Sequence, residues 1–300
     1  MKNIAANIKR VGLIANPEKL DCREAVQEAA ALIAAAGRAV LSDKATADLA
    51  GLQSFDGLDA NRLTGQVDLL LVFGGDGTIL RVARDVAGSH TPILGLNSGG
   101  LGFLTAASSQ QLGHALENVW SGLFAVESRS LIEATGQSQG KTFAQIALND
   151  FVVSRGTIPR LIELEVGVDD EVLTSYRCDG LIIGSPTGST AYSLAAGGPV
   201  VCPNAEVFAL TPICPHTLSN RSVIVSSNST VRVKVLSQKI ETVLSADGQV
   251  QLQLASGDLV NVRRSRNSVR LVRLTGTSFF ATLRQKLHWS GSTVTAPEGQ

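Results

Sequence analysis

Three glycines and one acid within five residues form the part of this chain with the clearest chemical signature. The motif Gly74-Gly75-Asp76-Gly77-Thr78 follows an apolar run after Asp68 that is typical of a strand buried on both faces. Glycines let the backbone turn sharply and approach a ligand, and Thr78 is expected to cap a helix over Ile79 to Val86. Because unpaired N–H groups and the helix dipole favour anions, the pattern predicts a phosphate loop at Gly74, Gly75, Gly77 and Thr78.

Asp76 is the one acidic residue in this turn. A phosphate pocket normally avoids a carboxylate, so we expect Asp76 to serve as a base, a metal ligand or a substrate anchor. The plainer alternative is a glycine turn in which Asp76 caps the helix. The strand before the motif and the helix after it favour the functional interpretation.

A second stretch, from Asp179 to Pro199, gathers hydroxyl groups, glycines and the ring of Tyr192 in an uncharged segment. Such a surface suits a sugar and a flat base, because hydroxyls pair with ribose and glycines let the backbone come close. A tight turn between strand and helix is the structural alternative. Asn149-Asp150, after the predicted strand Ala144–Leu148, offers an amide and a carboxylate to paired hydroxyls.

Strands and helices alternate in the first third of the chain. The predicted elements are a strand Val11–Ala15, a helix Cys22–Ala36 capped by Asp21 and stopped by Gly37, a strand Ala39–Leu41, the strand before the motif, a strand Pro92–Leu96 and a helix Ser108–Trp120. A second glycine-rich turn runs from Asn97 to Phe103. This order predicts an α/β domain with a doubly wound, Rossmann-like parallel sheet, in which both glycine turns lie at carboxyl ends of strands.

The apolar period changes to two in the rest of the chain. Ile162–Val168, Val231–Val235 and Val250–Leu254 alternate apolar and polar residues, with turns at Asp169-Asp170 and Asp247-Gly248. This pattern predicts an all-β, β-sandwich-like second domain. We expect an α/β domain over 1–104, a β-rich domain over 105–275, a terminal helix over 276–289 that packs back on the first domain, and a disordered tail over 290–300.

Composition limits the classes of function. The 300 residues are 44% hydrophobic and 17% charged, which indicates a globular chain. Twenty-six basic residues balance twenty-six acidic ones, and aromatics make up only 4%, so neither nucleic acid nor a membrane is an expected partner. The four cysteines and four histidines show no metal-ligand spacing, and no signal sequence or membrane-spanning run is found, so a cytoplasmic location is expected.

Several weaker motifs have ordinary structural explanations. Gly136–Thr142 has one residue too few for a Walker loop and is better explained as a hairpin turn. Five arginines alternate with apolar residues and indicate a solvated strand face rather than a polyanion site: Arg263, Arg264, Arg266, Arg270 and Arg273. Cys178 is expected to be buried and inert, and His216 to order a loop.

Taken together, these stretches resemble the NAD kinase family. The resemblance rests on motifs in the family's order: Gly74–Thr78, Asn97–Leu104, Asn149-Asp150, Asp179-Gly180, Pro186–Tyr192 with Gly197-Gly198-Pro199, Pro215–Arg221 and Asp247-Gly248-Gln249. The chain departs from the family's pattern at Ser185, Ala195 and Ser222, which affects fine substrate contacts.

The resemblance implies an NAD kinase/diacylglycerol kinase-like fold and a phosphotransferase that acts on an alcohol group. In this reaction ATP and a divalent metal cation, expected to be Mg²⁺, phosphorylate the adenosine ribose 2′-hydroxyl of NAD to give NADP. The resemblance makes Asp76 the general base and implies a homo-oligomer, a dimer or tetramer. It also implies an NAD site lined by Asp76, Gly77, Asn149, Asp150, Arg160, Arg177, Asp179, Thr190, Ala191, Tyr192, Ser193, Leu194, Ala195 and Gln249.

Two other functions stay open at this point. Lipid, sphingoid or sugar-phosphate kinases also carry a glycine-rich aspartate motif, but they leave the Asp179–Pro199 stretch unexplained. An NAD-sensing binding protein without catalysis is the alternative from another class, and the intact Asp76-Gly77 argues against it. The sequence does not distinguish ATP from polyphosphate as donor, NAD from NADH as acceptor, or a dimer from a tetramer, and it leaves NADPH feedback open.

Overall fold

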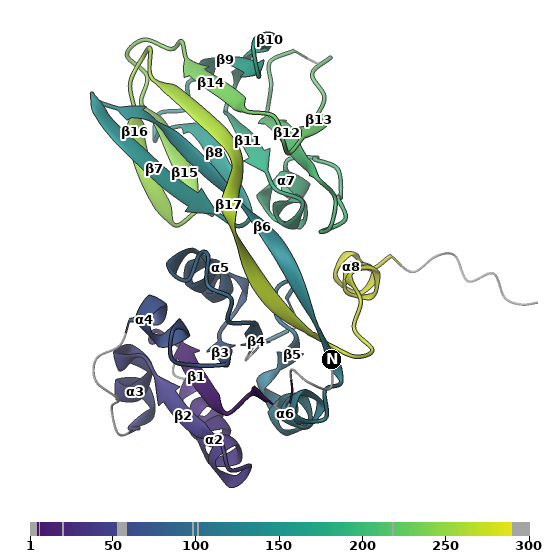
Figure 1. The fold of residues 1–300 in the computed structure, drawn as a ribbon. Coiled ribbons are helices and arrows are strands. Elements are labelled where there is room, and N and C mark those ends of the chain that lie inside the picture. Colours follow the sequence, from purple (N-terminus) through teal and green to yellow (C-terminus); the bar gives the residue numbers. More distant parts are fainter. Residues whose placement is uncertain are drawn as a thin grey trace, which may run out of the picture. The chain divides into compact units, whose positions relative to one another are not determined.

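The computed structural model describes residues 5, 7–19, 21–52, 59–97, 99–100, 102–217 and 219–289. The predicted tail over 290–300 lies outside the described residues. The chain forms two compact units: unit 1 comprises 1–79, 91–127 and 271–300, and unit 2 comprises 80–90 and 128–270. Two long strands, β6 (Phe124–Ser138) and β17 (Leu259–Leu274), contribute residues to both units (Figure 1).

Unit 1 is built on the predicted parallel sheet. Its strands are β1 (Arg10–Ala15), β2 (Ala39–Ser42), β3 (Leu69–Phe73) and β4 (Ile93–Asn97), hydrogen-bonded in the order β4-β3-β1-β2. The short strand β5 (Ala107–Ser108) pairs with β4, and so does β17, through Leu271 and Ile93. Leu69, Leu71 and Phe73 of β3 belong to a core cluster with α2 and α6. On the other face of the sheet, Leu70 of β3 and Leu63 of α4 both lie beside Gly12 of β1. Helices therefore cover both faces of the sheet, as predicted for a doubly wound fold.

The helices of unit 1 differ from the predictions in detail. They are α2 (Cys22–Ala35), α3 (Lys44–Ala50), α4 (Ala60–Thr64), α5 (Asp76–Asp85, which continues into unit 2), the 3₁₀ turn η1 (Ser109–Gln111), α6 (Leu112–Trp120) and α8 (Phe279–Leu287). Gly37 ends α2 with a φ of 71°, as predicted, but Asp21 makes no side-chain cap to that helix. Both α3 and α4 lie in the polar stretch between the predicted strand Ala39–Leu41 and Gly65, where no helix was predicted.

Unit 2 is a pair of antiparallel sheets around one core. One sheet has the order β13-β12-β11-β8-β15-β16, and the other contains β10, β9, β14 and β17 with the β6–β7 hairpin. The further strand bounds are β7 (Lys141–Ala147), β8 (Asp150–Arg155), β9 (Ile162–Val168), β10 (Glu171–Cys178), β11 (Gly180–Gly184), β12 (Val207–Ile213), β13 (Val223–Ser226), β14 (Val231–Val235), β15 (Thr242–Ala246) and β16 (Val250–Leu254). Apolar side chains of both sheets share one buried cluster, which confirms the sandwich-like prediction.

The weaker motifs have the structures expected of them. Gly136–Thr142 is the turn of the β6–β7 hairpin. Three of the five arginines of β17 form ion pairs: Arg263 with Glu133, Arg264 with Glu206 and Arg273 with Glu127. Cys178 is buried, and burial raises the pKa of its thiol to about 12, so it is inert. Among the described residues, no helix has the length and hydropathy needed to cross a membrane.

Candidate active site

The glycine turn of unit 1 lies at the carboxyl end of β3. The carbonyl of Gly75 accepts hydrogen bonds from the N–H groups of Thr78 and Ile79, so the helix α5 begins at Asp76. The prediction that Thr78 caps a helix starting at Ile79 was wrong, because Thr78 lies inside the first turn. Gly74 has a φ of 151°, and a Cβ there would lie 2.3 Å from Oγ1 of Thr78. The turn therefore requires glycine at this position.

Asp76 links the two glycine-rich turns of unit 1. Its Oδ2 accepts a hydrogen bond from the N–H of Phe103 at 2.9 Å, and its Oδ1 accepts one from the N–H of Leu104 at 3.1 Å. A Cβ on Gly102 would lie 2.0 Å from Oδ1 of Asp76, so only glycine leaves room for the carboxylate. Each carboxylate oxygen still has a lone pair free for a ligand hydroxyl, and the side chain is half-buried.

A cation and an amide complete this edge of the parallel sheet. A Cβ added to Gly75 would lie 3.9 Å from Nζ of Lys19, which is in the loop after β1. The same Cβ would lie 4.0 Å from Oδ1 of Asn97, at the end of β4. Asn97 also shapes the second turn, since it donates to the carbonyl of Gly100 at 2.6 Å. Lys19 was missed from the sequence, because its one signal is its place in the loop after a parallel strand.

Within unit 2, a buried acid holds the predicted pair Asn149-Asp150. Asp247 follows β15, and its Oδ1 accepts from the N–H groups of Asn149 at 2.7 Å and Asp150 at 3.2 Å, while its Oδ2 accepts from Leu148 at 3.1 Å. Nη1 of Arg84 donates to the same Oδ2 at 2.7 Å, and Arg84 also bonds the side chain of Gln249. This arrangement brings Asn149, Asp150 and Gln249 together.

Asp150 is a titratable group of unit 2 whose pKa is strongly shifted. Its side chain is buried, and within the described part of the chain its carboxyl group has no hydrogen-bond partner. Burial first, and the negative charge of Asp247 second, raise the pKa of Asp150 to about 7. Near neutral pH the group therefore exists in both forms, and it can accept from or donate to a ligand hydroxyl.

The segment after β11 forms a wall beside this pair. β11 ends opposite Asp150, because Gly184 is its partner in the sheet register. The N–H of Ser185 donates to the carbonyl of Asn149 at 2.8 Å, and a Cβ on Gly188 would lie 2.1 Å from that carbonyl oxygen. The 3₁₀ turn η2 (Thr187–Thr190) and the short helix α7 (Tyr192–Ala195) follow. Tyr192 is 49% exposed, which leaves its ring available to a flat partner.

Three of the predicted NAD-binding residues do not join this group. Asp179 precedes β11, whereas Asp150 and Ser185 lie at its other end. Nε of Arg155 donates to Oδ1 of Asp179 at 2.7 Å, and Arg177 forms an ion pair of 3.9 Å with Glu163. Arg160 is exposed in the loop after β8. Six residue steps at about 3.3 Å put Asp179 about 20 Å from Ser185 along the strand direction.

No group of three or more His, Cys, Asp or Glu side chains among the described residues is arranged to hold a metal ion. The carboxylate of Asp76 is bound by backbone amides, and that of Asp247 is bound by backbone amides and by Arg84. Asp247 and Arg84, which hold Asn149, Asp150 and Gln249 together, were not predicted as site residues. Asp247-Gly248 was interpreted as a turn and, with Gln249, as one of the motifs of the family resemblance, but no role was given to Asp247. The contact of Arg84 with Asp247 joins residues too far apart in the sequence to be predicted from it.

Comparisons with known proteins agree with this geometry. The model of the ATP-NAD kinase N-terminal domain matches residues 11–124, and that of the ATP-NAD kinase C-terminal domain matches residues 148–274. An NAD kinase of Syntrophotalea carbinolica is 40% identical over 283 residues, 94% of this chain and 99% of the relative. Among solved structures, yeast NADH kinase complexed with NADH aligns with a TM-score of 0.85 and 28% identity, covering 96% of this chain and 90% of that one.

A second solved structure carries the other nucleotide. An NAD kinase from Archaeoglobus fulgidus in complex with ATP aligns with a TM-score of 0.74 and 25% identity, over 94% of this chain and 100% of that one. Both halves of the chain thus match the family's two domain models, and the site residues fall within the matched ranges. The chain belongs to the NAD kinase family.

Proposed function

We propose that this chain transfers the terminal phosphoryl group of ATP to the 2′-hydroxyl of the adenosine ribose of NAD, with Asp76 as the general base. NAD kinase activity itself follows from family membership at 40% identity over nearly the whole chain. The observation that carries the assignment of the base is the carboxylate of Asp76, held by two backbone amides next to the predicted phosphate loop. The hydroxyl proton passes to Asp76, the hydroxyl oxygen forms the new bond to phosphorus, and ADP leaves.

The phosphate-binding part of the proposal rests on unit 1. Gly74 and Gly75 precede α5, and Gly77 and Thr78 lie in its first turn, where the positive end of the helix dipole attracts phosphate. The ammonium group of Lys19 near Gly75 adds a positive charge at the same loop. Phosphoryl transfer depends mainly on positioning and charge neutralisation, which these groups supply.

The divalent cation enters this proposal as part of the nucleotide substrate. Among the described residues no set of protein ligands is built for a metal, and Mg²⁺ is commonly held by substrate phosphates and water with only one or two carboxylates. When bound with ATP, the cation neutralises phosphate charge. The residues of the chain then orient the nucleotide and the acceptor hydroxyl.

The β-rich part of the chain, expected over 105–275, is proposed to bind NAD, the acceptor of the phosphoryl group. Asn149 and Asp150 are proposed to bind ribose hydroxyls of NAD, because they are consecutive residues that carry an amide and a carboxyl group, and Asp247 holds the backbone N–H groups of both. Thr190 to Ala195 and Gln249 line the same end of the sheet, and the exposed ring of Tyr192 suits stacking. Gly77 is proposed to contact NAD next to Asp76. A cytoplasmic location stays a prediction.

Arg160, Arg177 and Asp179 are proposed to contact NAD bound by a neighbouring copy of the chain. Within one chain they lie at the opposite end of β11 from Asp150. In a closed homo-oligomer, a dimer or tetramer, one copy's surface can complete the site of the next. This proposal gives Arg160, Arg177 and Asp179 a role in binding NAD. It does not require one dinucleotide to contact both ends of β11 within the same chain.

The decisive experiment uses two NAD analogues, one lacking the adenosine 2′-hydroxyl and one lacking the adenosine 3′-hydroxyl. Purified chain with ATP and Mg²⁺ is expected to phosphorylate NAD and the 3′-deoxy analogue but not the 2′-deoxy analogue. Phosphorylation of the 2′-deoxy analogue would contradict the proposal. Parallel reactions with polyphosphate and with NADH define the donor and acceptor, and a lipid substrate or NAD binding without product tests the two alternative functions.

A further inference from the structure

Arg155, the last residue of β8, contacts two segments that carry residues proposed to bind NAD. Its backbone N–H donates to the carbonyl of Asp179 at 3.0 Å, and its Nε donates to Oδ1 of Asp179 at 2.7 Å. Its Nη1 donates to the carbonyls of Gly156 and Ile158, each at 3.4 Å. One guanidinium group thus links Asp179 to the loop that follows β8.

This loop carries Arg160 and is held on two sides. The N–H of Arg160 donates to the carbonyl of Ile158 at 2.8 Å, and Arg155 binds that same carbonyl, so the guanidinium is coupled directly to the backbone of Arg160. On the other side, the carbonyl of Glu241 accepts from the N–H of Gly156 at 2.8 Å. A Cβ on Gly156 would lie 2.2 Å from Oε2 of Glu241, so the close approach requires glycine.

Asp179 and Arg160 both keep polar groups available to a ligand. Arg155 occupies Oδ1 of Asp179, and within the described part of the chain Oδ2 has no partner. The guanidinium of Arg160 is exposed and makes no hydrogen bond or ion pair with any described residue. A carboxylate accepts from hydroxyl and amide groups, and a guanidinium donates to phosphates, and NAD carries all of these groups.

The ion pair between Arg155 and Asp179 is too exposed to contribute much to folding. The two side chains are 28% and 31% exposed, and water screens an ion pair that it can reach. The pair instead supplies order, because bonds from one planar guanidinium restrict the carboxylate and the loop to one arrangement. Groups that are ordered before a ligand arrives bind it more tightly, since less entropy is lost on binding.

We propose that Arg155 is a positioning residue, which holds Asp179 and Arg160 in the arrangement that binds NAD. The proposal rests on the assignment of Asp179 and Arg160 to NAD under the proposed function. Arg155 itself needs no contact with the dinucleotide, because its effect passes through the two segments that it links. The proposed base Asp76 belongs to neither segment, so loss of Arg155 should weaken NAD binding without slowing the chemical step.

The test compares the kinetic parameters of Arg155→Ala with those of the parent chain. KM for NAD is expected to rise about 5- to 20-fold, while kcat and KM for ATP stay within about threefold of the parent. Calorimetric titration with NAD should show the same loss of affinity. Arg155→Lys keeps the positive charge without the planar fork and should recover part of the loss. The melting temperature of Arg155→Ala should fall by less than about 3 °C.

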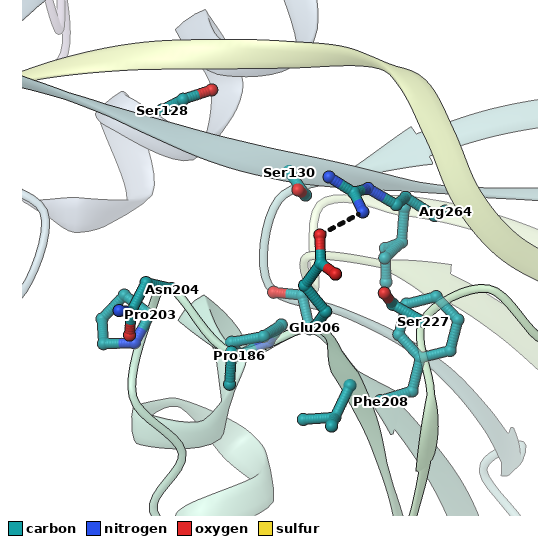
Figure 2. A pocket seen from close by; sticks show the side chains of 13 residues that line it. Ser128, Ser130, Pro186, Pro203, Asn204, Glu206, Phe208, Ser227 and Arg264 are labelled. Atoms are coloured by element: carbon teal, nitrogen blue, oxygen red, sulfur yellow. Dashed lines mark hydrogen bonds and ion pairs between the residues drawn. The ribbon is translucent and has the colours of Figure 1, made fainter.

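Arg264 of β17 provides the matched control, because it forms a comparable ion pair on the other sheet of unit 2. Its Nη1 donates to Oε1 of Glu206 at 2.9 Å, as the dashed line in Figure 2 marks, and the two side chains are 40% and 69% exposed. The pair lies at a pocket of about 210 Å³, and none of the residues proposed to bind NAD contributes to its lining. Arg264→Ala should lower the melting temperature equally little and leave KM for NAD within about twofold of the parent.

A combined variant separates positioning from a direct contact of Arg155 with NAD. If Arg155 acts only through Asp179 and Arg160, its removal should have little further effect once both side chains are gone. In a chain that already carries Asp179→Ala and Arg160→Ala, adding Arg155→Ala should therefore change KM for NAD by less than about twofold.

Four outcomes would overturn the proposal. These are an unchanged KM for NAD in Arg155→Ala, an equal rise in Arg264→Ala, a full further rise in the combined variant, and a melting temperature far below that of Arg264→Ala. The underlying assignment is judged separately. If Asp179→Ala and Arg160→Ala leave KM for NAD unchanged, the assignment and the proposal fail together. A rise in those two variants without one in Arg155→Ala removes the positioning role alone.

Discussion

The carboxylate of Asp76 has two tasks, because it holds the amides of Phe103 and Leu104 and is the proposed base. Asp76→Asn removes the base and replaces one acceptor oxygen by an NH₂ group that cannot accept from an amide. We expect turnover to fall by about 10²- to 10⁴-fold while NAD still binds. Initial rates of NADP formation and calorimetric NAD titration measure the two effects. Turnover within tenfold of the parent would show that the carboxylate is dispensable.

The raised pKa of Asp150 leads us to expect a specific dependence of the free energy of unfolding on pH. Its pKa rises from 3.8 to about 7 in the folded chain, so between these values the folded state binds a proton that the unfolded state has lost. This contribution to stability is fully present below pH 3.8 and is lost as the pH rises through about 7. Urea unfolding should show the parent losing about 2 kcal/mol more than Asp150→Asn between pH 5 and pH 8.

The control for that measurement is Asp170→Asn, since the carboxylate of Asp170 is fully exposed in its ion pair with Arg232. Its stability should follow the parent's pH dependence. Parallel curves for the parent and Asp150→Asn would mean that Asp150 titrates at an ordinary pKa in the folded chain.

Single residues were predictable from the sequence where the signal was local. Asp76 stands among glycines at the end of an apolar run, and Asn149-Asp150 follows a strand, so both were found. Lys19, Arg84 and Asp247 were not predicted as site residues, because each acts through contacts made only after folding. Arg84 and Asp247 are 163 residues apart in the chain.

At the scale of elements, we expect turnover to depend on the second glycine turn, which holds the carboxylate of Asp76, as well as on that carboxylate. A Cβ on Gly102 would lie 2.0 Å from Oδ1 of Asp76, whereas one on Gly100 in the same turn would meet nothing within 4 Å. Gly102→Ala must therefore displace the carboxylate and should lower turnover by at least tenfold. Gly100→Ala is the matched control and should stay within about twofold of the parent. Equal rates for the two variants would contradict this role of the turn.

The helix α5 offers a second comparison, between two of its own arginines. Arg84 pairs with the fully buried carboxylate of Asp247 at 2.7 Å, and Arg81 pairs with Asp85 at 3.4 Å where both side chains are about 40% exposed. Arg84→Met leaves a buried charge with only backbone partners and should cost about 3 kcal/mol in urea unfolding. Arg81→Met should cost less than about 1 kcal/mol. Similar losses would mean that Asp247 does not depend on Arg84.

Elements were predicted well where apolar residues recur with a clear period. The parallel strands and the strands β9, β14 and β16 have the expected positions. The helix α3 was missed because it buries Thr46, Ala47 and Ala50, small residues that produce no apolar period. The start of α5 was placed too late, because glycine is a poor helix former and Gly77 nevertheless lies in its first turn.

For the whole molecule, the change of apolar period from helical to alternating predicted two structural classes in one chain, and the parallel and antiparallel sheets confirm it. The neighbour order of the strands was beyond sequence reasoning. Antiparallel neighbours such as β9 and β14 are separated by several other strands in the chain, and nothing local specifies that pairing. For the same reason, the sequence did not indicate that Asp179 and Asp150 lie at opposite ends of β11.

That separation leads to a prediction about the assembled protein. If Asp179 acts on NAD bound by a neighbouring copy, then Asp76→Asn and Asp179→Ala damage the same site from different chains. Each variant alone should have low activity. In a mixed dimer, one site then combines the intact Asp76 of one copy with the intact Asp179 of the other.

The two variants, carrying different affinity tags, are co-expressed and assayed for NADP formation. Random pairing makes about half of the dimers mixed, each with one intact site of two, so about a quarter of the parent's activity should return. Tandem purification through both tags should raise this to about half. If each site is built within one chain, the mixture will show only the average of the two variants, and the assignment of Arg160, Arg177 and Asp179 to a neighbouring copy fails.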